Sequence, residues 1–221
     1  PYTTLFRSAF FKVMSKVARE LKLNELDEAA SRKGFSINSR SYSPIGVCAQ
    51  IIPWNFPLVM AGWKIGPILA TGCTTVLKTA EETPASASIL AEIIKDAGVP
   101  DGVINIITGG AEVGRALIAH PEIKKVAFTG STSVGREILK TVASHITNAT
   151  MELGGKSANI ILDDADLNIA VDGALYAFLY HSGQACDSGT RLLVQEGIYN
   201  EFMEKFLNRI KEIKVAPTTD P

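Results

Sequence analysis

Three side chains far apart in the sequence have types that could take part in nucleophilic chemistry. Cys186 lies among small residues in HSGQACDSGTR, where a cysteine is either a nucleophile or a small apolar residue of a loop. Glu152, after an apolar strand in MELGGKS, could be partly buried and therefore basic enough to act as a general base. Asn55 in PWNFP could donate a hydrogen bond to an oxyanion, or only shape the turn before Pro57.

Turns that carry glycine follow several predicted strands, and they could bind a nucleotide. ITGGAEVG and FTGSTSVG each precede a predicted helix, whose first backbone N–H groups and positive dipole end would suit a phosphate. Gly130 and Gly135 could instead serve only a tight turn and close helix packing. Lys78 and Glu81 in LKTAEETP could hydrogen-bond the hydroxyls of a ribose, or belong to a solvated charged loop.

The composition argues against several classes of protein. The 221 residues carry a net charge of −1, so there is no basic surplus for binding nucleic acid or an anionic membrane. The three cysteines are widely spaced and form no CxxC or Cys/His cluster, which argues against a disulfide framework or a metal site. No apolar run is long enough to span a bilayer and no signal peptide opens the chain, so we expect a cytoplasmic protein without membrane or nucleic-acid partners.

From Pro44 onward, short β-rich runs alternate with helical runs, which predicts an α/β fold. We expect a Rossmann-like parallel sheet with helices on both faces, followed by the start of a second α/β catalytic domain. The predicted strands are 47–52, 74–78, 103–108 and 125–129, and the predicted helices are 58–70, 84–97, 112–120 and 133–144. One face of the second helix should hold Ile89, Leu90, Ile93, Ile94 and Ala97.

A second section is expected from about Gly154. Its predicted elements are a strand in SANIILDD, a helix over 167–181, a strand in TRLLV and an amphipathic helix over 198–213. The apolar stripe of the last helix comprises Ile198, Phe202, Phe206, Ile210 and Ile213. We therefore predict a nucleotide-binding domain over 9–153 and a truncated catalytic domain over 154–221. Residues 1–8, PYTTLFRS, resemble a translated sequencing adapter, and both ends of the chain are expected to be cuts.

Five motifs, PWNFP, LKTAEETP, FTGSTSVG, MELGGKS and GQAC, occur in an order that resembles the aldehyde dehydrogenase superfamily. The resemblance covers nearly the whole chain from about Ser41. It implies NAD-dependent oxidation of a small-molecule aldehyde to a carboxylic acid, and a full-length form that is a homo-oligomer. No segment of this sequence is assigned to the family's oligomerisation arm, and the truncated chain itself is expected to be inactive.

The resemblance also implies a role for each motif residue. Cys186 would be the nucleophile that forms a thiohemiacetal and then a thioester, and Glu152 would activate the hydrolytic water. Asn55 and the backbone N–H of Cys186 would stabilise the oxyanion, so all three side chains should converge on one pocket at the junction of the two sections. Lys78 and Glu81 would hold the adenosine ribose, and the turn over 129–135 would face the pyrophosphate. The residues expected to contact the cofactor are Ile52, Pro53, Trp54, Lys78, Glu81, Gly110, Thr129, Gly130, Ser131, Val134, Gly135, Leu153 and Gly154.

NAD is expected in preference to NADP, because the charge of Glu81 would repel a 2′-phosphate. Two alternatives remain open. One is a branch of the family that transfers the acyl group to coenzyme A, against which Glu152 argues, and the other is a catalytically inactive nucleotide-binding fragment. The sequence departs from the family at Asp187 and Ser188, directly after Cys186. An anion that faced the sulfur would lower the fraction of thiolate.

Overall fold

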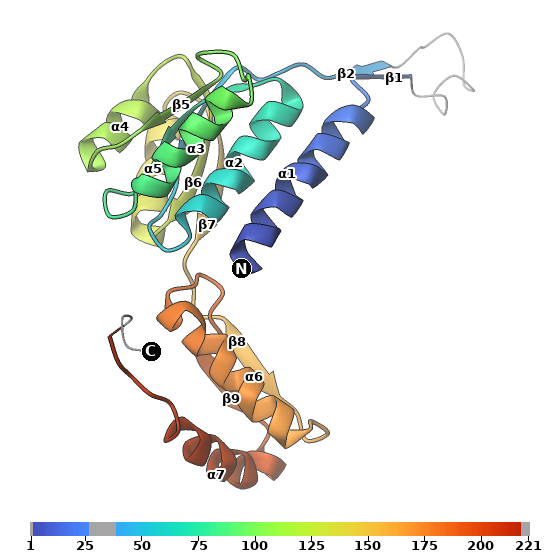
Figure 1. The fold of residues 1–221 in the computed structure, drawn as a ribbon, viewed down its shortest axis with the longest axis vertical. Helices are drawn as coiled ribbons and strands as arrows, with labels where there is room; N and C mark the ends of the chain where they lie inside the picture. The colour runs from blue at the N-terminus through green and yellow to red at the C-terminus, as the bar shows by residue number, and fades with distance from the viewer. Residues whose placement is uncertain (1, 27–38, 218–221) are drawn as a thin grey trace. The chain divides into compact units, whose positions relative to one another are not determined.

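A computed structural model describes residues 2–26 and 39–217, with the backbone alone for residues 2–8 and Leu26. The chain forms two compact units that divide between Leu153 and Gly154 (Figure 1). In the described ranges, no helix is long and apolar enough to span a membrane.

The first unit is built on a five-stranded parallel sheet with the strand order β5-β4-β3-β6-β7. The strands are β3 (Val47–Ile51), β4 (Thr74–Lys78), β5 (Ile104–Ile107), β6 (Ile123–Gly130) and β7 (Asn148–Leu153). The helices between them are α2 (Pro57–Thr71), α3 (Ala85–Asp96), α4 (Ala111–Ala119) and α5 (Thr132–Ala143). The predicted α/β class is confirmed. The chain reverses its direction across the sheet between β3 and β6, which is where open parallel sheets bind ligands.

Helices cover both faces of this sheet, and alternate strand residues supply the two apolar layers. The layer beneath α2 and α3 holds Ile52, Val59, Met60, Ala61, Ile65, Leu77 and Leu90. The layer beneath α4 and α5 holds Ala49, Ile118, Ile123, Val126, Phe128, Ile138 and Val142. Full burial of a side chain of this size contributes about 1.5–3 kcal/mol, so the two layers fix the strand ends that carry the candidate site.

Two features at the start of the chain were not predicted. The helix α1 (Tyr2–Glu20) packs on α2, and it includes residues 2–8, which the sequence analysis had set aside. Gly66 allows this packing, because a Cβ there would lie 2.8 Å from the ring of Phe10 and 2.9 Å from Met14. The strands β1 (Asn24–Leu26) and β2 (Ser39–Ser41) then form a separate antiparallel pair. Their three-residue length leaves too little alternation for a prediction from sequence.

The structure corrects the predicted apolar face of α3. Leu90 is buried and Ile94 is partly buried, but Ile89 and Ile93 are 58% and 57% exposed. Adjacent residues lie about 100° apart around a helix. In each of the pairs Ile89–Leu90 and Ile93–Ile94, only the second residue therefore points into the layer beneath α3.

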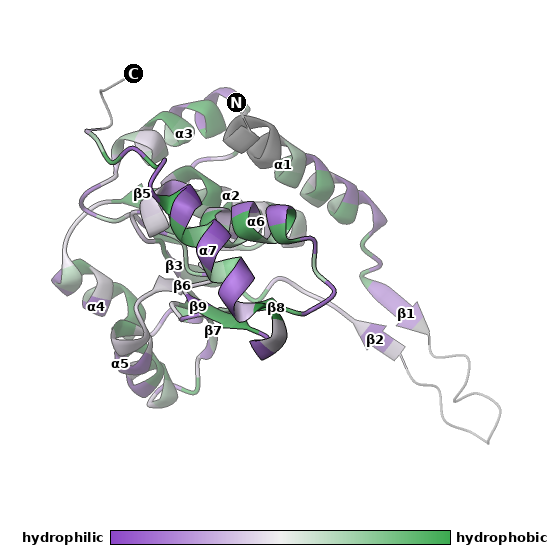
Figure 2. Cartoon of the chain, turned by 90° about the horizontal axis from the view of Figure 1, so that it is seen from below, coloured by the Kyte–Doolittle hydropathy of each residue, from purple (hydrophilic) through white to green (hydrophobic). Residues whose placement is uncertain are grey.

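The second unit pairs two short parallel strands with two helices. The strands are β8 (Ala158–Ile161) and β9 (Arg191–Val194), and the helices are α6 (Leu167–Leu179) and α7 (Tyr199–Ile210). Short 3₁₀ turns, η2 (Tyr180–Gly183) and η3 (Glu196–Ile198), complete the unit. The buried core includes Phe202 and Phe206, and the remaining three members of the predicted stripe pack against it. Figure 2 shows hydrophilic and hydrophobic residues on different sides of α7.

Helix α6 ends at Leu179, two residues before its predicted end. His181 and Ser182 have φ angles of 54° and 57°, and Gly183 has a φ angle of 75°. A right-handed helix cannot pass through three successive left-handed residues. At its other end, the Oδ1 atom of Asp166 accepts hydrogen bonds from the backbone N–H groups of Asn168 at 2.9 Å and Ile169 at 3.3 Å.

Candidate active site

The loops that carry most of the predicted cofactor residues start from one edge of the parallel sheet. In the strand register, Ile51 at the end of β3 pairs with Lys78 and with Phe128, and Gly130 at the end of β6 pairs with Leu153. Parallel strands end at the same edge, so side chains from distant parts of the sequence lie side by side there. Thirteen residues were predicted to contact the cofactor, and this edge or the turns that follow it hold Ile52, Pro53, Trp54, Lys78, Glu81, Thr129, Gly130, Ser131, Leu153 and Gly154.

A cavity of about 210 Å³ lies between α4 and α5, beside the ends of β3, β4 and β6. Three predicted residues line it, namely Lys78, Gly110 and Val134. Lys78 is only 7% exposed, and its Nζ atom donates a hydrogen bond to the Thr79 carbonyl at 3.0 Å. This lysine therefore does not belong to a solvated loop, which was the structural alternative for its motif.

A second glycine of α4 keeps this cavity open. Gly114 lines the cavity, and a Cβ atom at this position would lie 3.7 Å from the Cδ atom of Lys78 and 3.8 Å from Ile51. An added methyl group would thus fit without a clash but would occupy cavity space. The opening of the cavity is flanked by Arg115 and Glu137, whose Nε and Oε1 atoms form an ion pair at 2.6 Å.

The two glycine turns end at helix N-termini, as expected for a phosphate site, although side chains already use part of their donors. The Oγ atom of Ser131 accepts the Val134 N–H of α5 at 3.4 Å, and Glu112 accepts the Gly110 N–H at 3.2 Å. Gly135 lies inside α5, where a Cβ atom would come within 2.7 Å of Leu153. Close packing of α5 on β7 therefore requires this glycine, whatever its part in binding.

Sheet alternation separates Thr129 from the rest of its turn. Val126 and Phe128 face α4 and α5, whereas Thr129 points to the opposite face and lines a different cavity. The Thr129 side chain is therefore separated from the cavity that Lys78 lines, and the expectation that the turn over 129–135 faces the pyrophosphate stays a prediction. The physical reason for the separation is the two-residue period of a strand.

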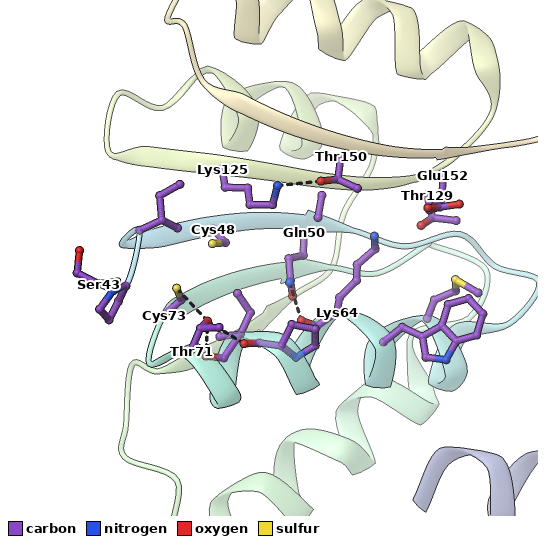
Figure 3. Close-up of a pocket in the computed structure, with 17 residues that line it drawn as sticks. Ser43, Cys48, Gln50, Lys64, Thr71, Cys73, Lys125, Thr129, Thr150 and Glu152 are labelled. Atoms are coloured by element: carbon purple, nitrogen blue, oxygen red, sulfur yellow. Dashed lines mark hydrogen bonds between the residues drawn. The ribbon is translucent and has the colours of Figure 1, made fainter. Parts of the chain in front are cut away.

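The second cavity, of about 580 Å³, lies between α2 and the strands β3, β6 and β7 (Figure 3). Glu152 and Thr129 line it together with the apolar side chains of Met60 and Trp63. Glu152 lies within β7 rather than after it, and it is exposed where partial burial was expected. β7 is an edge strand whose residues alternate between exposed and partly buried. Glu152 belongs to the exposed set.

Lys64 also lines this cavity, and the sequence analysis missed it. Burial lowers the pKa of Lys64 to about 8, while the negative charge of Glu152 opposes the shift and the charge of Lys125 adds to it. Gln50 is 3% exposed, and its Nε2 atom donates a hydrogen bond to the Lys64 carbonyl at 2.8 Å. A signal was present, since Lys64 is the only charged residue of α2.

Cys186 lies in the second unit, exposed in a turn after the left-handed segment. Two backbone hydrogen bonds hold this turn, from the Ser188 N–H to the Ala185 carbonyl at 3.3 Å and from the Gly189 N–H to the Ala177 carbonyl of α6 at 3.0 Å. Asn55 lies half-buried between β3 and α2 in the first unit. The convergence of Cys186, Asn55 and Glu152 stays a prediction, because Cys186 belongs to the second unit and the other two residues to the first.

Clusters of three or more histidine, cysteine or carboxylate side chains that could hold a metal ion are absent from residues 2–26 and 39–217. The first unit has a cavity of about 210 Å³ beside Lys78 and a carboxylate at a second cavity, and the second unit has an exposed thiol. Such groups suit nucleophilic and acid–base chemistry.

Comparison with known proteins gives concordant results. The sequence pattern described as the Aldehyde dehydrogenase family matches residues 7–221. An aldehyde dehydrogenase of Emericella nidulans is 54% identical over 177 residues, which are 79% of this chain and 36% of that protein. A mitochondrial aldehyde dehydrogenase of Homo sapiens is 51% identical over 181 residues, which are 81% of this chain and 35% of that protein. The chain thus spans about a third of the length of these relatives.

Solved structures resemble this chain over a larger share of its length than the two relatives above. The NAD+ complex of an aldehyde dehydrogenase from Bacillus cereus superposes with a TM-score of 0.85 at 41% identity, over 91% of this chain and 40% of that chain. A betaine aldehyde dehydrogenase from Staphylococcus aureus in complex with NAD+ gives a TM-score of 0.89 at 40% identity, over 96% of this chain and 41% of that chain. Together with the family match across nearly all of the sequence, these similarities show that the chain belongs to the aldehyde dehydrogenase family.

Proposed function

We propose that this chain supplies the nucleotide-binding section and the nucleophile of an enzyme that oxidises an aldehyde to a carboxylic acid with NAD. The observation that carries the proposal is the cavity between α4 and α5, lined by Lys78, Gly110 and Val134 at the switch point of the sheet. Relatives of 40–41% identity were solved as NAD+ complexes, which supports the same cofactor for this chain.

The residues of the first unit fit an adenosine group. The cavity of about 210 Å³ has largely apolar walls between two helices, which suit an adenine ring, and Lys78 could offer an ammonium group to the ribose. Glu81 is exposed in the turn after β4, where its carboxylate could accept hydrogen bonds from both ribose hydroxyls. The helix N-termini of α4 and α5 would then favour the pyrophosphate.

The chemical step requires a thiolate. The sulfur of Cys186 adds to the aldehyde carbon and forms a thiohemiacetal, whose negative oxygen is stabilised by Asn55 and the backbone N–H of Cys186. NAD, when bound, supplies the acceptor for the hydride that leaves this carbon with two electrons. The carbon is thereby oxidised to a thioester on Cys186.

Release of the product needs a base. Glu152 takes a proton from water while the water oxygen attacks the thioester carbon, and the carbon–sulfur bond breaks to give the carboxylic acid and the Cys186 thiolate. The substituent of the aldehyde would lie against Met60 and Trp63, which line the same cavity as Glu152. Lys64 lines the same cavity, where the charge of Glu152 favours the protonated form of Lys64.

Two alternatives predict different products. A coenzyme A-acylating enzyme would release an acyl-coenzyme A only when coenzyme A is added, whereas the proposed enzyme releases free acid. A nucleotide-binding chain without catalysis would bind NAD and produce no NADH. Glu152 beside the second cavity favours hydrolysis, because transfer to a thiol does not need an activated water.

The test uses two proteins. Calorimetry on the 221-residue chain measures the affinity for NAD, NADP and ADP-ribose. Turnover is measured in an Emericella chimera, in which the 177 matching residues of this chain replace their counterparts in the Emericella nidulans relative. We expect NADH and free carboxylic acid in equal amounts without coenzyme A. A chimera that folds and binds NAD but produces no NADH would rule out the proposed reaction.

A further inference from the structure

Two cysteines apart from the candidate nucleophile lie together inside the first unit. Cys48 is 2% exposed and Cys73 is 6% exposed, and with Ile68 they form a small buried cluster. Cys48 in β3 pairs in register with Thr75 in β4, so the two-residue period puts Cys73 on the same face of the sheet. The pair lies near the start of both strands, at the edge opposite to the loops with the candidate cofactor residues.

Hydrogen bonds give the two thiols different environments. The thiol of Cys48 donates a long hydrogen bond to the Gly46 carbonyl, with 4.0 Å between the sulfur and the oxygen. The Oγ1 atom of Thr71 lies 3.3 Å from the Cys73 sulfur, and Figure 3 draws this contact. The same hydroxyl lies 2.8 Å from the Pro67 carbonyl, so Cys73 shares this donor with the backbone of α2, while the thiol of Cys48 acts as a donor.

The surroundings of the two thiols shift their pKa values in opposite directions. Burial opposes ionisation of Cys73, but the hydrogen bonds from Thr71, Ile45, Gly46 and Cys48 together outweigh it and lower the pKa of Cys73. Burial raises the pKa of Cys48 to about 11, the nearby charge of Cys73 raises it further, and Lys125 opposes both effects. Cys73 is thus the thiol that ionises more readily, and Cys48 is the one that holds its proton more tightly.

The pair is buried from bulk solvent but reachable from the larger cavity. Both cysteines line the cavity of about 580 Å³ beside Pro44 and Thr71 (Figure 3). A molecule as small as hydrogen peroxide can enter a cavity of this size, whereas a bulky aromatic disulfide cannot reach side chains that are 2% and 6% exposed. Cys186, in contrast, is exposed to reagents of any size.

We propose that Cys48 and Cys73 form a redox-active dithiol, oxidised by small peroxides to an intrachain disulfide. The Cys73 thiolate attacks one oxygen of hydrogen peroxide, the oxygen–oxygen bond breaks, and Cys73 becomes a sulfenic acid as hydroxide leaves. The sulfur of Cys48 then attacks the sulfenic sulfur, the sulfur–oxygen bond breaks, and the hydroxyl group leaves with the Cys48 proton as water. Two electrons pass from the dithiol to the peroxide, which is reduced to water and hydroxide.

The test removes the exposed thiol first. The 221-residue chain with Cys186→Ser is treated with hydrogen peroxide under native conditions, digested and analysed by mass spectrometry. We expect a cross-linked peptide pair containing Cys48 and Cys73, with a mass lower by two hydrogen atoms and restored by a reducing agent. In the Cys48→Ser variant the Cys73 sulfenic acid should persist and be trapped by dimedone, whereas in Cys73→Ser the Cys48 thiol should stay unmodified. Circular dichroism checks that each variant is folded.

Selectivity for reagent size gives a second readout that needs no variant of the pair. A bulky aromatic disulfide should modify Cys186 of the unsubstituted chain and leave Cys48 and Cys73 reduced. Recovery of both thiols unmodified from the peroxide-treated Cys186→Ser chain, or oxidation of Cys48 in the Cys73→Ser variant, would overturn the proposal. Disulfides only between separate chains would overturn it as well. None of these outcomes depends on NAD binding or on turnover, so the proposed function is tested separately.

Discussion

The two units differ in how completely their sheets are covered. In the first unit five parallel strands lie between α2 and α3 on one face and α4 and α5 on the other. In the second unit α6 and α7 cover one face of β8 and β9. On the other face Ile160 and Leu193, which are partners in the strand register, are 62% and 49% exposed. Parallel strands are normally covered on both faces, so the second unit presents apolar surface that the first has buried.

This difference bears directly on the candidate site. The predicted cofactor residues are attached to ends of strands whose two apolar layers fix their positions. Cys186 is held by a turn with two backbone hydrogen bonds and by three preceding left-handed residues. We propose that nucleotide binding depends on the first unit, whereas the nucleophile itself comes from the second. The following predictions test this separation, from the largest expected effect to the smallest.

Substitution of Cys186 should separate chemistry from binding completely. In the Emericella chimera, Cys186→Ala should lower kcat by on the order of 10³-fold or more, because no other group can form the thioester. The affinity for NAD, measured by calorimetry, should change less than about twofold. A large loss of NAD affinity would show that the two units do not divide the work in this way.

Substitution of Glu152, at the last strand of the first unit, should affect only the second half of the reaction. Glu152→Gln in the chimera should lower steady-state turnover by about 10²–10⁴-fold, the usual contribution of a general base. The first turnover should still give a rapid burst of NADH, measured by stopped-flow absorbance, because thioester formation does not use this carboxylate. Loss of the burst along with turnover would assign Glu152 to an earlier step.

The choice of cofactor should depend on a single charge of the first unit. The chimera should prefer NAD to NADP by about tenfold to a few hundredfold in kcat/KM, since the Glu81 carboxylate would repel the 2′-phosphate. Glu81→Ser should reduce this preference by weakening NAD and admitting NADP. The matched control is Glu82→Ser, which removes the neighbouring exposed carboxylate. Equal effects of the two substitutions would exclude a specific contact of Glu81 with the ribose.

The pH dependence of stability should carry the signature of Lys64. The folded state disfavours the charged form of Lys64, so between pH 8 and the ordinary lysine range the unfolded chain binds more protons. The Lys64 contribution to the free energy of unfolding therefore rises with pH over this window, by on the order of 2 kcal/mol. Urea unfolding of the 221-residue chain and of Lys64→Met at both ends of the window measures it. Lys95→Met, at an exposed position of α3, is the control and should keep the pH dependence of the parent chain.

The smallest effects are expected from substitutions of two helix glycines, one in each unit. Gly114→Ala in α4 should raise stability by about 0.5–1 kcal/mol through helix propensity, yet weaken NAD binding by roughly threefold to tenfold. The added methyl group would enter the cavity beside Lys78. Gly173→Ala in α6 meets no atom within 4 Å and should raise stability similarly without changing the affinity. Calorimetry with NAD would reject the cavity as the nucleotide site if both variants bound equally well.

Periodicity and motif order in the sequence determined much of this protein. Alternating β-rich and helical runs predicted the α/β fold because each run has one structure that buries its apolar residues. The stripe of α7 was predicted correctly, since the 3.6-residue period left one solution for Phe202 and Phe206. The carboxyl edge with Lys78 and Gly130 followed from the rule that parallel strands end together.

Only the tertiary structure decided which residues face which cavity. Thr129 and Glu152 turn away from the cavity that Lys78 lines, because successive strand residues point to opposite faces and only the packing of the helices decides which cavity lies on each face. The early end of α6 came from the left-handed residues His181 and Ser182, which precede Gly183 and have ordinary helix propensity themselves. Lys64 and the Cys48–Cys73 pair gained their properties from burial between α2 and the sheet. Burial results from long-range packing. From the local sequence alone, Lys64 would be interpreted as a surface charge, and Cys48 and Cys73 as two small apolar residues.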